Sequence, residues 1–163
     1  MNFSLIFESF LKILNGLALS LEIIVLSLIL GFLASILIVL MRLSKNILFS
    51  RFSRGFIFSI RGTPLLVQIY FIYYGLAQFS FIRDSFLWII LKEPFWCGVI
   101  ALTINTSAYT AEIIRSGLNA ISKGQIESAT AFGMTKFQTF KRILIPQALR
   151  QSIPAYSNEI ILM

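Results

Sequence analysis

A long apolar stretch, from Ile13 to Met41, constrains this chain more than any other feature. It contains one charged residue, Glu22, and about 20 apolar residues in a helix are enough to cross the hydrocarbon core of a membrane. Hydrophobic residues make up 57% of the 163 residues and charged residues only 13%, compared with about 25% charged in an average soluble domain. A soluble globule of this size cannot bury so much apolar surface, so we expect an all-α integral membrane protein.

Two further apolar stretches predict further membrane crossings. We expect three complete transmembrane helices, over residues 13–41, 62–81 and 94–114, in a single helical-bundle domain that covers 1–163. Residues 153–163 have the composition of the start of a fourth span and are too few to cross a bilayer. We therefore expect a C-terminally truncated chain.

Basic residues lie mainly between the apolar stretches. Residues 42–61 carry Lys and Arg but no acid, the 82–93 connection is neutral, and the tail from Arg115 is basic again. Cytoplasmic loops carry an excess of Lys and Arg, so this pattern predicts a multi-pass protein with its N-terminus outside. The net charge of +7 therefore indicates anchoring at lipid headgroups and not nucleic-acid binding.

Missing residue types exclude most enzyme classes. The chain has no His, and Cys97 is its single cysteine. Zinc sites, catalytic triads and disulfide frameworks are therefore not expected, and neither is a metal or cofactor. The sequence also lacks a phosphate-binding loop, so we do not expect it to bind nucleotide.

The segment 115–150 is neither a span nor a disordered tail, and we expect two short cytoplasmic helices in it. Ser122 and Thr135 are each followed three residues later by Gln, the spacing of a capping box. Gly133 stands where a helix end often needs a left-handed residue. Pro146 either ends the second helix or begins the next one.

This segment resembles the EAA loop of binding-protein-dependent ABC importers. The matching residues are Glu127-Ser128-Ala129, then Gly133 after three residues, then Ile143-x-Ile145-Pro146 after nine. Ser128 and Ile145 depart from the family's Ala and Leu. The resemblance implies that Glu127, Ser128, Ala129, Gly133 and Pro146 form a coupling helix that docks on a separate cytoplasmic ATPase. The alternative is an amphipathic hairpin at the membrane interface without a partner.

Two other stretches are similar to permeases of the histidine, glutamine and arginine type. They are the segments 61–68, which begins Arg-Gly-Thr-Pro, and 105–117, which begins Asn-Thr-Ser-Ala-Tyr. The resemblance implies the membrane subunit of a bacterial ATP-driven importer of a polar amino acid, in the inner membrane. Its partners would be ATPase subunits, a periplasmic or lipid-anchored binding protein and a second, identical or related permease chain. The alternatives are a truncated remnant that inserts but transports nothing and, less favoured, a membrane-embedded enzyme.

Polar residues inside the expected spans are the candidates for a substrate path, because polar groups in a membrane are costly unless they face a cavity or a partner. Asn105 and Tyr109 are four residues apart and share a helix face, which Glu112 extends. The candidates are Gln68, Asn105, Ser107, Tyr109 and Glu112. The alternative is hydrogen bonding between helices.

A helix break is expected at Arg61, Gly62, Thr63 and Pro64, with a structural or gating role. Arg61 is expected either to reach the interface or to pair with Glu112 or Glu127. Glu22 is either a functional acid within the first span or a residue near the outer interface. The sequence does not name the amino acid that is carried.

Overall fold

The computed structural model describes residues 3–162, and the side chains of residues 9, 10 and 12–161. Throughout that range the regular elements are helices, and none is a strand. Two of the described helices are long and apolar enough to cross a membrane, α1 (Phe3–Leu43) over Lys12–Leu43 and α6 (Pro94–Asn119) over its full length. The expected 13–41 and 94–114 stretches lie inside these two helices.

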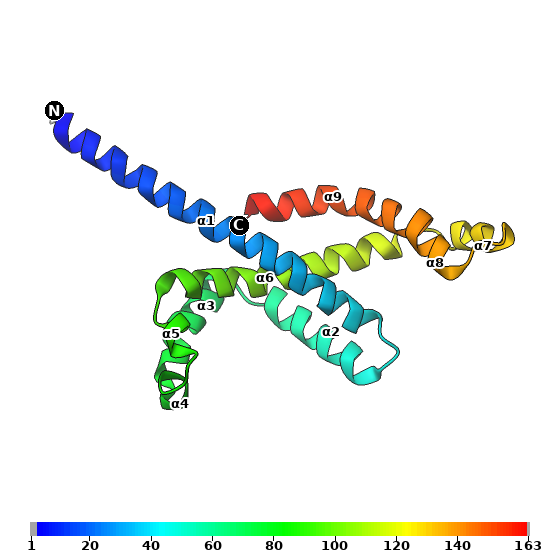
Figure 1. Ribbon diagram of the computed structural model, residues 1–163, viewed down its shortest axis with the longest axis horizontal. Helices are drawn as coiled ribbons and strands as arrows, with labels where there is room; N and C mark the ends of the chain where they lie inside the picture. The colour runs from blue at the N-terminus through cyan, green and yellow to red at the C-terminus, as the bar shows by residue number, and fades with distance from the viewer. Residues whose placement is uncertain (1–2, 163) are drawn as a thin grey trace.

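Helices α1 and α6 form the centre of the bundle and approach each other closely (Figure 1). A Cβ atom added at Gly31 of α1 would lie 2.8 Å from the Thr106 Cβ atom of α6, so the two helices touch where Gly31 has no side chain. Nearby, the Ser27 hydroxyl donates a hydrogen bond to the Val99 carbonyl oxygen across the interface at 3.2 Å. Small residues of this kind let membrane helices pack backbone against backbone.

Helix α2 (Ile47–Arg61) turns back along the end of α1. The Asn46 side chain accepts a hydrogen bond from the Leu48 backbone N–H at 2.9 Å and caps the new helix. The Ser53 hydroxyl donates to the Ile38 carbonyl oxygen at 3.0 Å, which holds α2 against α1. Ile57 is buried against both α1 and α6.

The expected 62–81 span is not one straight helix. The part from Leu65 to Gln78 consists of α3 (Leu65–Tyr70), a π-helical turn (Phe71–Gly75) and a 3₁₀ turn (Leu76–Gln78), and it meets α2 at an angle of 104°. Pro64 starts α3 in an extended conformation and has no N–H to continue the helix. If α2 and the segment Leu65–Gln78 are counted together as one broken span, the described residues contain three candidate membrane spans.

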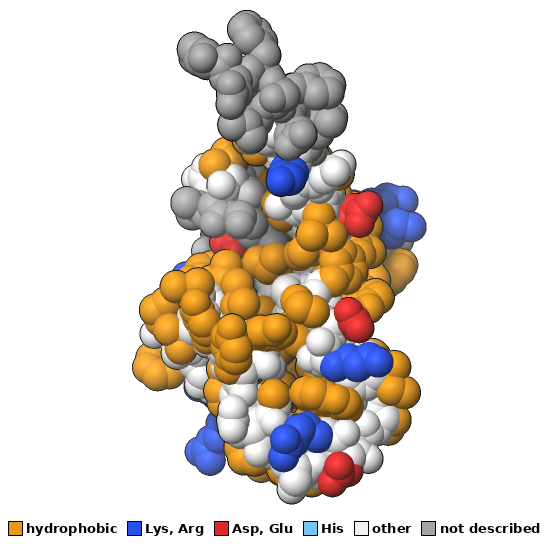
Figure 2. Space-filling model, turned by 90° about the vertical axis from the view of Figure 1, so that its left-hand side faces the viewer, with side chains coloured by type: hydrophobic (Ala, Val, Ile, Leu, Met, Phe, Trp, Pro, Cys, Tyr) orange, Lys and Arg blue, Asp and Glu red, His pale blue; other side chains and the backbone are white. Residues whose placement is uncertain are grey.

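Two short helices, α4 (Ser80–Arg83) and α5 (Trp88–Leu91), connect this region to α6. Figure 1 shows them at one end of the molecule, with α7 (Lys123–Ala131) and α8 (Lys136–Thr139) at the other. Hydrophobic side chains cover much of the face shown in Figure 2. Large hydrophobic side chains are also exposed along most of the described part of α1. A surface with this much exposed apolar area suits contact with lipid better than contact with water.

The last helix, α9 (Ile145–Leu162), begins well before the expected 153–163 stretch; Met163 lies outside the described residues. It follows directly on a π-helical turn, η3 (Phe140–Leu144). Pro146 is the second residue of α9, but the helical backbone runs without interruption from α8 through η3 into α9, so Pro146 neither ends one helix nor starts a separate one. The Ser152 hydroxyl donates to the Ile113 carbonyl oxygen at 3.3 Å and holds α9 on α6.

Candidate functional site

Of the two short helices expected in the 115–150 segment, the first is α7. The second, α8, follows a sharp turn but is not a separate short helix, because the helical backbone continues from it through η3 and α9 to Leu162. Gly133 has a φ of 73°, so the predicted left-handed residue is confirmed. The capping box at Thr135 is also confirmed: its hydroxyl accepts from the Gln138 N–H at 3.3 Å, and the Gln138 side chain accepts from the Thr135 N–H at 2.9 Å. The box predicted at Ser122 is wrong, because Ser122 precedes α7 in an extended conformation without a side-chain capping bond.

The turn between α7 and α8 presents aromatic side chains to the outside. Phe132 is 88% exposed and Phe137 is 72% exposed. Among the residues expected to couple to an ATPase, Ala129 is buried, whereas Glu127, Ser128, Gly133 and Pro146 are exposed. We call the exposed segment 127–137 the coupling knob. A rigid, apolar projection of this kind is suited to binding a groove on another protein.

The helix break at 62–64 is held by the side chain of Gln68. Its amide nitrogen donates to the Ile60 carbonyl oxygen at 2.8 Å and to the Thr63 carbonyl oxygen at 3.1 Å. It also lies 3.0 Å from the Thr63 hydroxyl. The Ile60 carbonyl oxygen also accepts from the Thr63 backbone N–H and hydroxyl, whereas Gln68 supplies the donor for the Thr63 carbonyl oxygen at the end of α2. Gln68 is only 8% exposed, so these are buried hydrogen bonds that hold the corner between α2 and α3.

Asn105, on α6, is hydrogen-bonded to Gln68 and so connects this corner to α6. Its side-chain nitrogen donates to the Gln68 side-chain oxygen at 3.1 Å, and its side chain is 7% exposed. For Gln68 and Asn105 the geometry therefore matches the alternative of hydrogen bonding between helices. Asn105 also lines a cavity, described next, so for this residue the two interpretations are compatible.

A cavity of about 390 Å³ opens between the α2–α3 corner, α6 and α9, and we call it the central cavity. The break residues Arg61 to Pro64 form one wall, and Asn105 and Tyr109 form another. The Arg61 guanidinium lies 5.0 Å from the centre of the Tyr109 ring, within reach of a cation–π interaction. Arg61 and Tyr109 also line a neighbouring cavity of about 340 Å³ that reaches Glu112 and Ser152.

Glu159 is the acidic residue that α9 contributes to the central cavity. Its side chain is only 9% exposed, yet it makes no ion pair among the described residues. The sequence analysis did not select Glu159 as a site residue. The available signal was an acid within the apolar stretch that begins a further membrane helix.

The alternative of an ion pair between Arg61 and Glu112 or Glu127 is not seen among the described residues. Glu112 pairs with Arg115 one turn along α6, with the Arg115 Nε atom 2.9 Å from the Glu112 Oε2 atom, and not with Arg61. Glu127 is exposed on α7 and makes no ion pair with Arg61 either. Ser107, a predicted residue of the substrate path, is buried, donates to the Ile104 carbonyl oxygen at 2.7 Å and does not line either of these two cavities. Glu112 and Ser107 thus both bond to partners within one turn of α6.

Comparison with known proteins places these features in one family. Residues 23–163 match the family model described as binding-protein-dependent transport system inner membrane component. The chain is 49% identical over 158 residues to the octopine transport system permease protein of Rhizobium radiobacter, covering 97% of this chain and 64% of the relative. It is 48% identical over 164 residues to the nopaline transport system permease protein of Agrobacterium fabrum, covering 100% and 68%.

More distant relatives agree. The arginine ABC transporter permease protein of Haemophilus influenzae is 38% identical over 158 residues, covering 96% of this chain and 69% of the relative. A crystal structure of an amino acid ABC transporter with histidines superposes with a TM-score of 0.85 at 37% identity, covering 100% of this chain and 72% of that one. The chain spans about two thirds of the length of the curated relatives it matches.

Proposed function

The chain belongs to the family of binding-protein-dependent transport system inner membrane components, and on that premise we propose that it acts in the ATP-driven import of an amino acid. The observation that carries the proposal is the connection between the coupling knob and the central cavity. The knob lies on the connection between the end of α6 and the start of α9, and these helices supply Tyr109 and Glu159 to the cavity. A displacement of the knob is thereby passed to the cavity walls.

The coupling knob is the proposed binding site for a separate ATPase subunit. Phe132 and Phe137 supply the apolar contact, and the left-handed turn at Gly133 fixes their direction. Closure of the ATPase on nucleotide would move the knob as a rigid unit. The two helices that it joins would then open or close the cavity, as in other transporters that work by rocking of rigid parts.

The central cavity is the proposed site for the substrate, which we propose to be an amino acid with a cationic side chain. Glu159 supplies a buried carboxylate for that side chain, and Arg61 supplies a guanidinium for the α-carboxylate. The names of the octopine, nopaline and arginine permeases support a substrate related to these compounds.

The orientation in the membrane is also a proposal. The coupling knob and the basic 42–61 segment would face the cytoplasm, whereas the N-terminus and α4–α5 would face outward, toward a substrate-binding protein. Glu22 is exposed on α1, and Arg42 lies 20 positions further along the same helix. Twenty residues of helix extend about 30 Å, the thickness of the hydrocarbon core. We therefore place Glu22 at the outer interface. A second permease chain would complete the transport unit.

Reconstitution with the ATPase tests the proposal directly. The chain, an ATPase subunit from the same organism and any second permease would be purified together and placed in liposomes with the binding protein. We expect co-purification, and ATP hydrolysis that rises with a cationic amino acid and not with an anionic one. Failure of the ATPase to co-purify would overturn the proposed coupling.

The variant Glu159→Gln tests the substrate class within the same assay. It should abolish stimulation by the cationic amino acid while the ATPase still co-purifies. Glu93→Gln, which removes an exposed acid in the connection before α6, is the matched control and should behave as the unaltered chain. Equal stimulation of both variants would remove Glu159 from the substrate site.

A further inference from the structure

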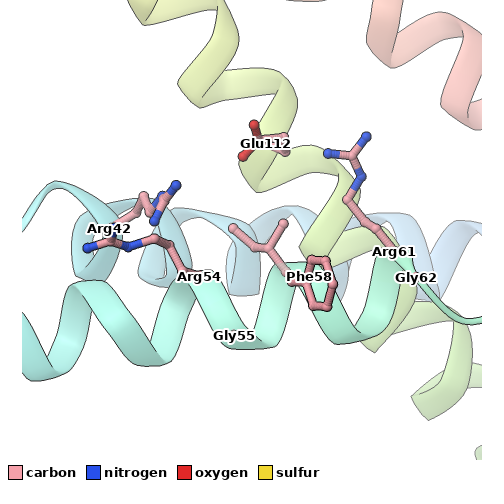
Figure 3. Close-up of a pocket in the computed structure, with 8 residues that line it drawn as sticks. Arg42, Arg54, Gly55, Phe58, Arg61, Gly62 and Glu112 are labelled. Carbon is pink, nitrogen blue, oxygen red and sulfur yellow. The ribbon is translucent and has the colours of Figure 1, made fainter.

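A third, larger cavity lies where α2 turns back along α1, and its chemistry differs from that of the central cavity. It measures about 690 Å³, and we call it the basic cavity. Figure 3 shows Arg42 of α1 and Arg54 of α2 next to each other at one end, Arg61 at the other end, and Glu112 of α6 between them.

The charges around the basic cavity do not balance within the chain. Glu112 is the one carboxylate in its lining, and it is already paired with Arg115. Arg42 and Arg54 make no ion pair among the residues that the structure describes. Two guanidinium groups held side by side repel each other unless an anion lies between them. Arg54 is held there by its own helix, since its Nε atom donates to the Ser50 carbonyl oxygen at 3.3 Å.

The remaining lining of the basic cavity is apolar. Ile57 forms part of its floor, and Phe58, which is 82% exposed, forms part of its edge. Gly55 leaves an opening, since a Cβ atom added there would meet nothing within 4 Å. A free anion would use only the arginines. A ligand with an anionic head and an apolar chain would use both the arginines and the apolar edge.

We propose that the basic cavity binds the phosphate headgroup of an anionic phospholipid, with an acyl chain lying along the Phe58 side of α2. Arginine binds phosphate oxygens with paired N–H donors, and basic pockets between membrane helices on the cytoplasmic side bind anionic headgroups. The inference rests on the proposed function only for its orientation, which puts Arg42 and Arg54 at the cytoplasmic leaflet.

Lipid retention by the purified chain tests the proposal. The chain in a non-ionic detergent would be titrated with phosphatidylglycerol or with phosphatidylcholine of the same acyl chains, and native mass spectrometry would count the retained lipids. We expect one retained phosphatidylglycerol per chain and no comparable retention of phosphatidylcholine. Arg42→Gln/Arg54→Gln should weaken retention about tenfold or more, as expected for losing charged hydrogen-bond donors. Arg51→Gln, on the same helix and outside the lining, should not.

Two glycine variants test whether the lipid needs the open space of the basic cavity at Gly55, independently of the charge of the arginines. Gly55→Leu should fill the opening and reduce retention, and the fold should survive because leucine favours a helix more than glycine does. Gly16→Leu is the control, since a Cβ atom there also meets nothing within 4 Å and the position is far along α1.

Three results would overturn the proposal. One is equal loss of retention in Arg51→Gln, which would indicate general surface charge. Another is retention of phosphatidylcholine as strong as that of phosphatidylglycerol. The third is saturable binding of inorganic phosphate as tight as that of the lipid, which would identify a free-phosphate site instead. Co-purification of the ATPase with the unaltered chain is measured separately, and its failure would overturn the importer proposal while leaving the lipid result in place.

Discussion

The side-chain amide of Asn105 donates a hydrogen bond to the side-chain oxygen of Gln68 over 3.1 Å, and this bond joins α6 to the corner between α2 and α3. Gln68 in turn donates to the carbonyl oxygens of Ile60 and Thr63. One buried amide therefore connects a helix end, a helix start and the central helix. The wall of the central cavity next to Arg61 depends on this connection.

Replacing Gln68 by leucine should destabilise the chain. Leucine would remove the bonds from Gln68 to the Thr63 carbonyl oxygen and to Asn105, and leaving the buried Asn105 amide without its acceptor costs roughly 1–3 kcal/mol. Thermal unfolding in detergent would measure the loss as a lower midpoint. The control is Gln78→Leu, because Gln78 is exposed at the end of the same helical segment. Equal midpoints for both variants would show that the corner does not depend on Gln68.

The bond between Asn105 and Gln68 can be measured with a double-mutant cycle. Combining Asn105→Ala with Gln68→Ala should give a coupling free energy of roughly 0.6 kcal/mol and at most about 1.7 kcal/mol, as for other hydrogen bonds between membrane helices. Unfolding in mixed micelles supplies the four free energies. Additive effects of the two changes would mean that the bond contributes nothing to stability.

A transport assay should distinguish the role of Asn105 from that of Ser107. Asn105 lines the central cavity, whereas Ser107 bonds within its own helix outside that lining. We therefore expect Asn105→Leu to lower amino-acid uptake severalfold at unchanged membrane abundance, and Ser107→Ala to leave uptake unchanged. Uptake in whole cells, corrected for abundance, is the measurement. Normal uptake in Asn105→Leu would restrict Asn105 to packing.

Gly133→Val should impair the coupling knob. Its φ of 73° lies in the left-handed region, where a β-branched side chain costs on the order of 1–3 kcal/mol. There is open space around Gly133, so the expected effect comes from the backbone and not from a clash. The amount of ATPase that co-purifies should fall. Gly124→Val is the control, because Gly124 has equally open surroundings and no positive φ. A similar yield from both variants would contradict the role assigned to the turn.

Gly31→Val should separate α1 from α6. The added side chain would meet the Thr106 side chain, and forcing extra atoms into a packed interface costs about 1–3 kcal/mol. Gly16→Val, on the open part of the same helix, should change the unfolding midpoint little. If both variants unfold at the same temperature, the close approach of α1 and α6 is not important for stability.

Features that depend on a few neighbouring residues could be predicted from the sequence. The long apolar stretches predict α1 and α6, because the length of an apolar run decides whether a helix can cross a membrane. The turn at Gly133 and the capping box at Thr135 follow from local backbone geometry. The prediction failed at Ser122, where a matching spacing did not produce the hydrogen bond.

The site itself was decided by the tertiary structure. The sequence placed Asn105 and Tyr109 on one face of a helix, and they do line one cavity. It did not reveal that Gln68 would bond to Asn105, that Arg61 would lie over Tyr109, or that Glu159 would complete the central cavity. These residues come from helices far apart in the chain, and their meeting depends on the 104° bend after α2 and on the packing of α9 against α6. Helical periodicity acts over three or four residues, whereas a cavity depends on how whole helices cross.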